Sequence, residues 1–138
     1  YEIKLDNYSK VLHIEAQTML DMVWKDILPA ASAYTKELAE TVAAKKAIGG
    51  GIDTSYEERL AGHVSVLLAS ATKKAEALEY ALMGVKDITD TLALARYYRD
   101  TIFAAMNELR IIVDEMETHC AAKYWPYPSY GDILFSVK

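Results

Sequence analysis

Three histidines are the side chains of this chain best suited to hold a metal ion or to accept a phosphoryl group. His13, His63 and His119 are spread along the sequence, and each falls in a different predicted helix. A di-metal site of the ferritin type needs Glu-x-x-His on two helices, whereas Glu115 stands four residues before His119 and Met116 stands three before it. The spacing therefore predicts structural or solvent-exposed histidines and no metal site.

An exposed histidine on a helical bundle can instead accept a phosphoryl group on an imidazole nitrogen. His63 is the best candidate, because Gly62 beside it would leave room for a docking partner. A histidine phosphotransfer bundle centred on His63 is therefore an alternative function for the chain. The structural alternative is that Gly62 allows close helix packing and that His63 is simply exposed.

The other reactive side chains form no recognisable catalytic motif. Acidic pairs such as residues 57–58 are typical of helix caps and solvated faces. Arg96, Arg99 and Arg110, together with Arg59, would bind an anion if they converged, and the alternative is that they pair with neighbouring acids such as Asp100 and Asp114. The first three are also the candidates for side chains lent to a neighbouring active site. Cys120 falls on an apolar stripe and is expected to be a small core residue. Walker loops, dinucleotide fingerprints and nucleophile elbows are absent from the sequence, so we assign no catalytic, cofactor-binding or metal residue.

Long helices must position all of these side chains, because apolar residues recur at alternating spacings of three and four. The predicted helices cover about residues 8–47, 55–84 and 88–121, and a tail follows at 122–138. Pro29 interrupts the first helix, so we expect a kink or split that gives the bundle a four-helix appearance. The predicted fold class is all-α, an elongated antiparallel bundle of three long helices forming a single domain over residues 1–138.

The connections between these helices are also marked in the sequence. Three glycines at 49–51 should end the first helix. A capping box at the start of the second helix can be formed by Thr54 with Glu57 or by Ser55 with Glu58. The third helix carries a seven-residue repeat typical of a coiled-coil seam, at Ile88, Ala95, Ile102, Leu109 and Met116.

Composition places the chain among globular proteins. Hydrophobic residues make up 52% of the 138 residues and charged residues 25%, which is too apolar for a disordered chain. The net charge of -5, with 15 basic residues dispersed among 20 acids, argues against nucleic acid and against an anionic membrane surface. A single cysteine and the lack of a transmembrane run favour a cytoplasmic protein. The start at Tyr1, without Met and inside an ordered pattern, suggests a fragment of a longer chain.

The end of the sequence is rich in aromatic residues and interrupted by prolines, in the run YWPYPSYGDILF at 124–135. Pro126 and Pro128 exclude helix and favour extended backbone at the residues before them. So much apolar surface should dock on something, either on its own bundle or on a neighbouring domain or subunit. The candidate interface residues are Trp125, Tyr127, Tyr130, Leu134 and Phe135.

This aromatic run resembles the carboxyl terminus of the type III glutamine synthetases. Two further segments are similar to that family: IEAQTMLDM at 14–22 followed by ILPAA at 27–31, and MNELR at 106–110. The resemblance spans nearly the whole chain, with its motifs in the expected order. It identifies the chain as the C-terminal domain of such an enzyme.

The resemblance implies a parent enzyme that joins glutamate and ammonia, using ATP and Mg²⁺ or Mn²⁺, in large oligomers. The catalytic motifs of the family belong to an upstream domain, and no residue here matches them. The implied function is therefore a non-catalytic helical domain that supports the catalytic domain or the oligomer. Its expected partners are the upstream catalytic domain of the same chain and neighbouring subunits.

Overall fold

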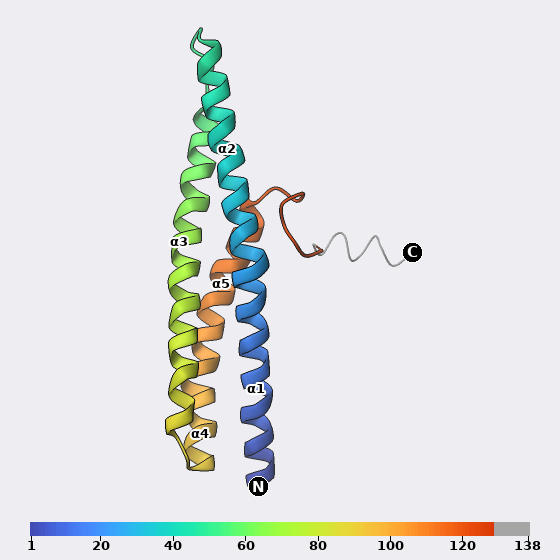
Figure 1. Ribbon diagram of the computed structural model, residues 1–138, viewed down its shortest axis with the longest axis vertical. Coiled ribbons are helices and arrows are strands. Elements are labelled where there is room, and N and C mark those ends of the chain that lie inside the picture. Colours follow the sequence, from blue (N-terminus) through green and yellow to red (C-terminus); the bar gives the residue numbers. More distant parts are fainter. Residues whose placement is uncertain (129–138) are drawn as a thin grey trace, which may run out of the picture.

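The computed structural model describes residues 1–128 of the chain, and they are almost entirely helical (Figure 1). The elements are α1 (Glu2–Met22), the π-helical turn η1 (Val23–Ile27), α2 (Leu28–Ile48), α3 (Ser55–Met83), the 3-10 turn η2 (Gly84–Asp87), α4 (Thr91–Tyr97), the π-helical turn η3 (Tyr98–Ile102) and α5 (Phe103–His119). Within residues 1–128 there is no β-strand. The prediction of an all-α fold built on three long helices is confirmed.

The first rod of the bundle consists of α1, η1 and α2 (Figure 1). It begins at Glu2, earlier than the predicted start near residue 8. The amide of Leu5 already donates a hydrogen bond to the carbonyl of Tyr1, at 3.2 Å. The regular backbone hydrogen bonds thus extend the helix to the start of the chain, ahead of the apolar residues from which it was predicted.

The rod passes Pro29 without ending, and the wider turn η1 lies just before this proline. Pro29 lacks an amide hydrogen, and its ring crowds the carbonyl four residues earlier. In η1 the amide of Leu28 instead bonds to the carbonyl of Val23, five residues back. Such a π-helical turn re-pairs the backbone next to the proline. The interruption expected at Pro29 is thus a local change of helix type centred before the proline.

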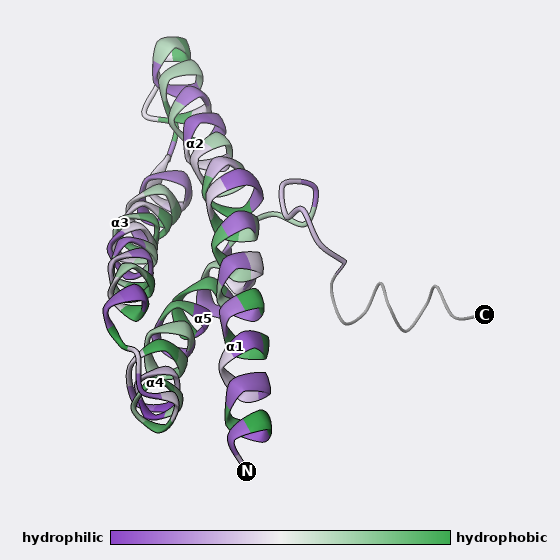
Figure 2. Cartoon of the chain, turned by 60° about the horizontal axis from the view of Figure 1, so that its bottom comes forward, coloured by the Kyte–Doolittle hydropathy of each residue, from purple (hydrophilic) through white to green (hydrophobic). Residues whose placement is uncertain are grey.

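Three rods run antiparallel, the first formed by α1 and α2, the second by α3 and the third by α4, η3 and α5 (Figure 1). Helix α3 packs most extensively, against α2 and against α5, while α1 meets α4. Hydrophobic and hydrophilic residues alternate along each rod in Figure 2, as amphipathic helices require. The buried residues of the first rod include Leu12, Ala16, Val23, Ile27, Tyr34 and Leu38, and those of the third include Ala95, Ile102, Leu109 and Met116.

The turn between α2 and α3 is built on three consecutive glycines. Gly49, Gly50 and Gly51 have φ values of 79°, 73° and 74°, which side-chain-bearing residues rarely adopt. Neither predicted capping box forms at the start of α3. The N-cap residue Thr54 makes no side-chain capping bond, and Ser55 bonds to Asp53 rather than to Glu58. The Asp53 carboxylate instead accepts hydrogen bonds from the amide and the hydroxyl of Ser55, at 2.9 and 3.0 Å.

The third rod begins at Thr91, three residues after its predicted start at residue 88, because the turn between α3 and α4 is longer than expected. Asp90 caps α4, and its carboxylate accepts a hydrogen bond from the amide of Ala93 at 2.9 Å. The hydroxyl of Tyr97 donates to the carbonyl of Ala81 at 2.7 Å and so joins α4 to the end of α3. At the other end, α5 finishes at His119 because Cys120 has extended backbone.

Candidate functional site

The aromatic C-terminal segment turns back onto the bundle directly after α5. The amide of Tyr124 donates to the carbonyl of Ala121 at 2.9 Å, and that of Trp125 donates to Ala122 at 3.2 Å. These bonds reverse the chain where the helix ends. Three aromatic side chains then lie half-buried against the core, those of Tyr124, Trp125 and Tyr127.

Specific contacts fasten this segment to α2 and η1. The ring of Tyr124 packs on that of Tyr34, with centroids 5.4 Å apart. Lys123 Nζ lies 3.0 Å from Glu37 Oε1, on the exposed surface of α2. The Tyr127 hydroxyl donates a hydrogen bond of 2.7 Å to Asp26 Oδ2. The described part of the segment therefore covers its own bundle.

Burial and the Asp26 carboxylate together raise the pKa of Tyr127 to about 12, and burial is the larger cause. Burial likewise raises the pKa of Tyr34, which lies under the segment. Both phenols are neutral at ordinary pH, so Tyr127 is a hydrogen-bond donor toward Asp26 there.

The predicted interface residues thus fall into two groups. Trp125 and Tyr127 contact the bundle of the same chain, whereas Tyr130, Leu134 and Phe135 lie outside the described residues. A role in contacts with another domain or subunit stays a prediction for all five.

An open apolar groove runs between α1 and α5. Its lining includes Ile14, Met19 and Met22 from α1, with Leu109 and Val113 from α5. The side chain of Ile14 is 62% exposed there. Sequence reasoning missed this groove, although Ile14 and Met22 are apolar residues that stand off the buried stripe.

Three potential metal ligands meet on the surface between α3 and α5. His63 Nε2 lies 3.8 Å from Glu115 Oε1, and the rings of His63 and His119 are in edge contact with centroids 4.3 Å apart. One ligand atom from each of the three residues lies within 4.8 Å of the others. The spacing argument did not find this cluster, because it compared residues within one helix only.

The same cluster bears on the phosphotransfer alternative. Gly62 faces open space, so His63 is accessible to a partner as that hypothesis requires. The Glu115 carboxylate beside the imidazole would, however, repel an incoming phosphoryl group at this distance. The geometry is therefore better suited to binding a cation than to accepting a phosphate.

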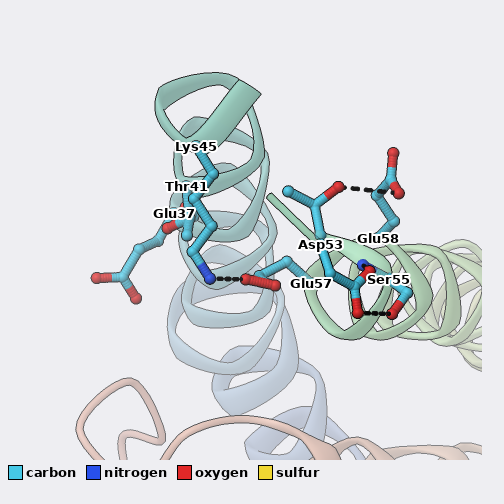
Figure 3. A network of polar contacts seen from close by, with 8 residues as sticks. Glu37, Thr41, Lys45, Asp53, Ser55, Glu57 and Glu58 are labelled. Atoms are coloured by element: carbon cyan, nitrogen blue, oxygen red, sulfur yellow. Dashed lines mark hydrogen bonds and ion pairs between the residues drawn. The ribbon is translucent and has the colours of Figure 1, made fainter. Parts of the chain in front are cut away.

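Polar contacts join α2 to the start of α3, and Figure 3 shows the ion pair of Lys45 with Glu57 among them. Lys45 reaches across to Glu57, which is only 5% exposed, and Lys46 pairs with Glu58 at 3.1 Å. The hydrogen bond from Lys45 is the largest cause that lowers the pKa of Glu57. Glu57 therefore belongs to a structural ion pair between helices, not to the solvated face expected from the sequence.

The arginines of the third rod do not converge on one point. Arg110 lines the groove between α1 and α5, whereas Arg96 and Arg99 line a separate depression beside the N-terminus. Arg99 pairs with its neighbour Asp100, at 2.8 Å, and this pairing lowers the pKa of Asp100. Cys120 packs against the core, and its burial raises the thiol pKa, which disfavours the reactive thiolate.

Comparison with known proteins links the chain to one family. Residues 1–46 match the family described as "Glutamine synthetase C-terminal domain". The whole chain is 38% identical to a glutamine synthetase of Butyrivibrio fibrisolvens over 141 positions. It is 31% identical to a type-3 glutamine synthetase of Dictyostelium discoideum over 97% of its length. The chain spans 20% and 19% of the length of these two relatives.

A third relative, a glutamine synthetase of Bacteroides fragilis, is 23% identical over 98% of this chain. None of the helices within residues 1–128 combines the length and the apolar character needed to cross a membrane.

Proposed function

This chain belongs to the glutamine synthetase C-terminal domain family and is related to a type-3 enzyme, and we propose that it is a non-catalytic helical support within its parent protein. The alignment of the whole chain with a glutamine synthetase at 38% identity carries the proposal. The parent would join glutamate and ammonia with ATP and Mg²⁺ or Mn²⁺ in the cytoplasm. The catalytic domain of the same chain and neighbouring subunits would be its partners.

The His63 cluster and the two lysines beside the glycine turn are poorly suited to the metal and nucleotide of such a parent. Mg²⁺ and Mn²⁺ prefer oxygen ligands, whereas the cluster at His63 offers two imidazoles and one carboxylate. Lys45 and Lys46, next to the glycine turn, are already paired with Glu57 and Glu58. We therefore propose that ATP and its metal ions bind elsewhere in the parent.

The apolar groove between α1 and α5 supports a bracing role. Apolar surface that stays open to water is unfavourable unless a partner covers it. Ile14 and Met22, in this groove, are both exposed in the chain alone. In the proposal, the catalytic domain or a neighbouring subunit covers this groove.

The aromatic segment supports the same role from the other end of the chain. Trp125 and Tyr127 hold the segment on the rod close to η1. We propose that Tyr130, Leu134 and Phe135, which follow, add to the contact with the parent. The aromatic segment would then connect the bundle to its partner.

A matched pair of substitutions in the full-length parent tests the groove. Ile14 and Ile111 are 62% and 67% exposed, and only Ile14 lines the groove. Ile14→Glu should disturb assembly, because it places a charge in a buried contact, while Ile111→Glu should not. Sedimentation velocity and the melting temperature measure both outcomes. Equal behaviour of the two variants would refute the proposed groove contact.

The role of the aromatic segment is tested by replacing both Trp125 and Tyr127 by Ala. Full burial of one large apolar side chain contributes about 1.5–3 kcal/mol, so removing two half-buried ones should cost roughly 2 kcal/mol. Tyr80→Ala is the control, since Tyr80 is 79% exposed on α3. An unchanged oligomer size and melting temperature in the double variant would refute the proposed role of the aromatic segment.

The non-catalytic assignment is tested separately from assembly. Arg96→Ala and Arg99→Ala should leave the rate of glutamine formation per assembled oligomer unchanged, because neither side chain is proposed to reach a reacting atom. Steady-state kinetics on assembled fractions provide the measurement. A large fall in kcat with normal assembly would show instead that this domain lends a side chain to an active site.

A further inference from the structure

We propose that His63, Glu115 and His119 form a binding site for a divalent transition metal ion such as Zn²⁺. This site goes beyond the proposed supporting role and uses none of its contacts. It is the only group of three potential metal ligands found together within residues 1–128. The two imidazoles and one carboxylate are a donor set that zinc accepts in proteins.

The backbone that carries these ligands is firmly placed. Glu115 and His119 are one turn apart on α5, so their side chains share a face. His63 comes from α3, which packs against α5 along the bundle. Val64 and Met116, the neighbours of His63 and Glu115, are both completely buried. The register between the helices is therefore fixed by the core beneath the site.

The ligand atoms are close to a coordinating arrangement. His63 Nε2 and Glu115 Oε1 are 3.8 Å apart, and all three ligand atoms lie within 4.8 Å of one another. In a tetrahedral zinc site with bonds of about 2.0–2.2 Å, neighbouring ligand atoms are roughly 3.3–3.6 Å apart. In the proposal, rotation of the side chains brings the ligand atoms this much closer together.

The surroundings leave the side chains free to make that rotation. The side chains of His63 and Glu115 are 42% and 50% exposed. Gly62 faces open space, and the cluster lines an open depression on the surface. Three protein ligands and an accessible face leave a coordination position for water or for a group from a partner.

Charge and ligand type both favour a transition metal over Mg²⁺. A cation would balance the charge of the Glu115 carboxylate, which lies beside the imidazole of His63. Imidazole binds Zn²⁺, Cu²⁺ and Ni²⁺ well, whereas Mg²⁺ takes oxygen ligands in octahedral geometry. The site should therefore discriminate between Zn²⁺ and the Mg²⁺ that an ATP-dependent parent would use.

Titration of the metal-free 138-residue chain with Zn²⁺ tests the site. Calorimetry should give one Zn²⁺ per chain, and Zn²⁺ should raise the melting temperature because it binds the folded state. An excess of Mg²⁺ should neither compete nor stabilise. No detectable Zn²⁺ binding at millimolar concentration, or equal binding of Mg²⁺, would overturn the proposal.

Substitutions then locate the bound ion. His119→Gln and Glu115→Gln should each weaken binding by at least the roughly 10- to 100-fold that loss of an outer-shell partner costs. The matched controls are His13→Gln and Glu108→Gln, because neither residue belongs to the cluster. Circular dichroism verifies that each variant is helical. If all four variants bind Zn²⁺ equally well, the ion is bound elsewhere and the proposed site is wrong.

A direct signature separates ligation from a general effect on stability. Zn²⁺ should shift the imidazole NMR signals of His63 and His119, and should leave those of His13 in place. His13 is a suitable internal reference because its ring nitrogen bonds to the Tyr98 hydroxyl, at 2.8 Å. Shifts confined to His13, or absent from His63 and His119, would exclude this site.

Discussion

At the scale of single residues, Tyr127 fastens the C-terminal segment to the rod through one hydroxyl group. The pKa of this phenol rises from 10.0 to about 12, through burial first and the bond to Asp26 second. The neutral hydroxyl donates to the Asp26 carboxylate, whereas a tyrosinate would be repelled by it. Because the folded-state pKa is raised, the stabilisation is complete below pH 10 and is lost as the pH rises to about 12.

Tyr127→Phe should therefore loosen the segment at neutral pH by about 0.5–1.5 kcal/mol, the net contribution of one hydrogen bond. The fluorescence of Trp125, followed in a Trp24→Phe background, reports on docking of the segment. The chain with Tyr127 should show a transition between pH 10 and about 12. The same transition in the Tyr127→Phe chain would show that another group causes it.

The contacts between single residues were harder to predict than their burial. Glu115 and His119 are recognisable as a same-face pair from their spacing alone. His63 joins them only through the register of α3 on α5, which depends on how Val64 and Met116 pack. In the same way, Tyr127 meets Asp26 at a separation of 101 residues, which no local pattern encodes.

At the scale of elements, the helices follow from apolar periodicity and their ends from local chemistry. The buried residues Leu12, Val23 and Leu38 lie on one face of the first rod, as the spacing of apolar residues by three and four requires. The change to π-helix at η1 was not predictable, because Pro29 specifies only that the regular bonding must change. A capping box was predicted from residue types, in which a Glu side chain would accept a hydrogen bond from the first amide of the helix. In the structure the Asp53 carboxylate accepts the bond from the Ser55 amide instead, in an Asx turn.

Two glycines that face open space should respond oppositely to substitution by Ala. Gly49 has a φ of 79° and a ψ of -166°, a conformation strained for any residue with a side chain. Gly49→Ala should destabilise the chain by about 1–3 kcal/mol. Gly62 lies inside α3, where a Cβ would meet nothing within 4 Å, so Gly62→Ala should stabilise it by about 0.5–1 kcal/mol.

Chemical denaturation of the two variants measures this contrast. Because neither added methyl group meets another atom, packing is unchanged and backbone conformation alone is compared. Destabilisation by Gly62→Ala would indicate that α3 is not helical at that point. A neutral Gly49→Ala would indicate that the turn adopts another conformation.

At the scale of the whole molecule, stability should be uneven along the long axis. The hairpin of α2 and α3 extends beyond the end of α5 (Figure 1), so only two rods pack at that end. Buried apolar residues of α2 end at Leu38, and those of α3 begin at Val64. Between them, the buried side chains are the polar ones of Thr54 and Glu57. The hairpin tip thus has a buried ion pair, that of Glu57 with Lys45, where the rest of the bundle has apolar side chains.

Hydrogen exchange should then show that amides at residues 42–60 exchange faster than those around Leu78 and Leu109, which are fully buried. Glu57→Gln should accelerate exchange at the tip by about tenfold or more, because it leaves Lys45 unpaired beside a buried site. Glu58→Gln is the matched control, since the pair of Glu58 with Lys46 is exposed. Its effect should stay below about fivefold, as exposed ion pairs contribute about 0–1 kcal/mol. Uniform acceleration along all three rods in Glu57→Gln would mean that the bundle opens as one cooperative unit, and the tip would then have no separate stability.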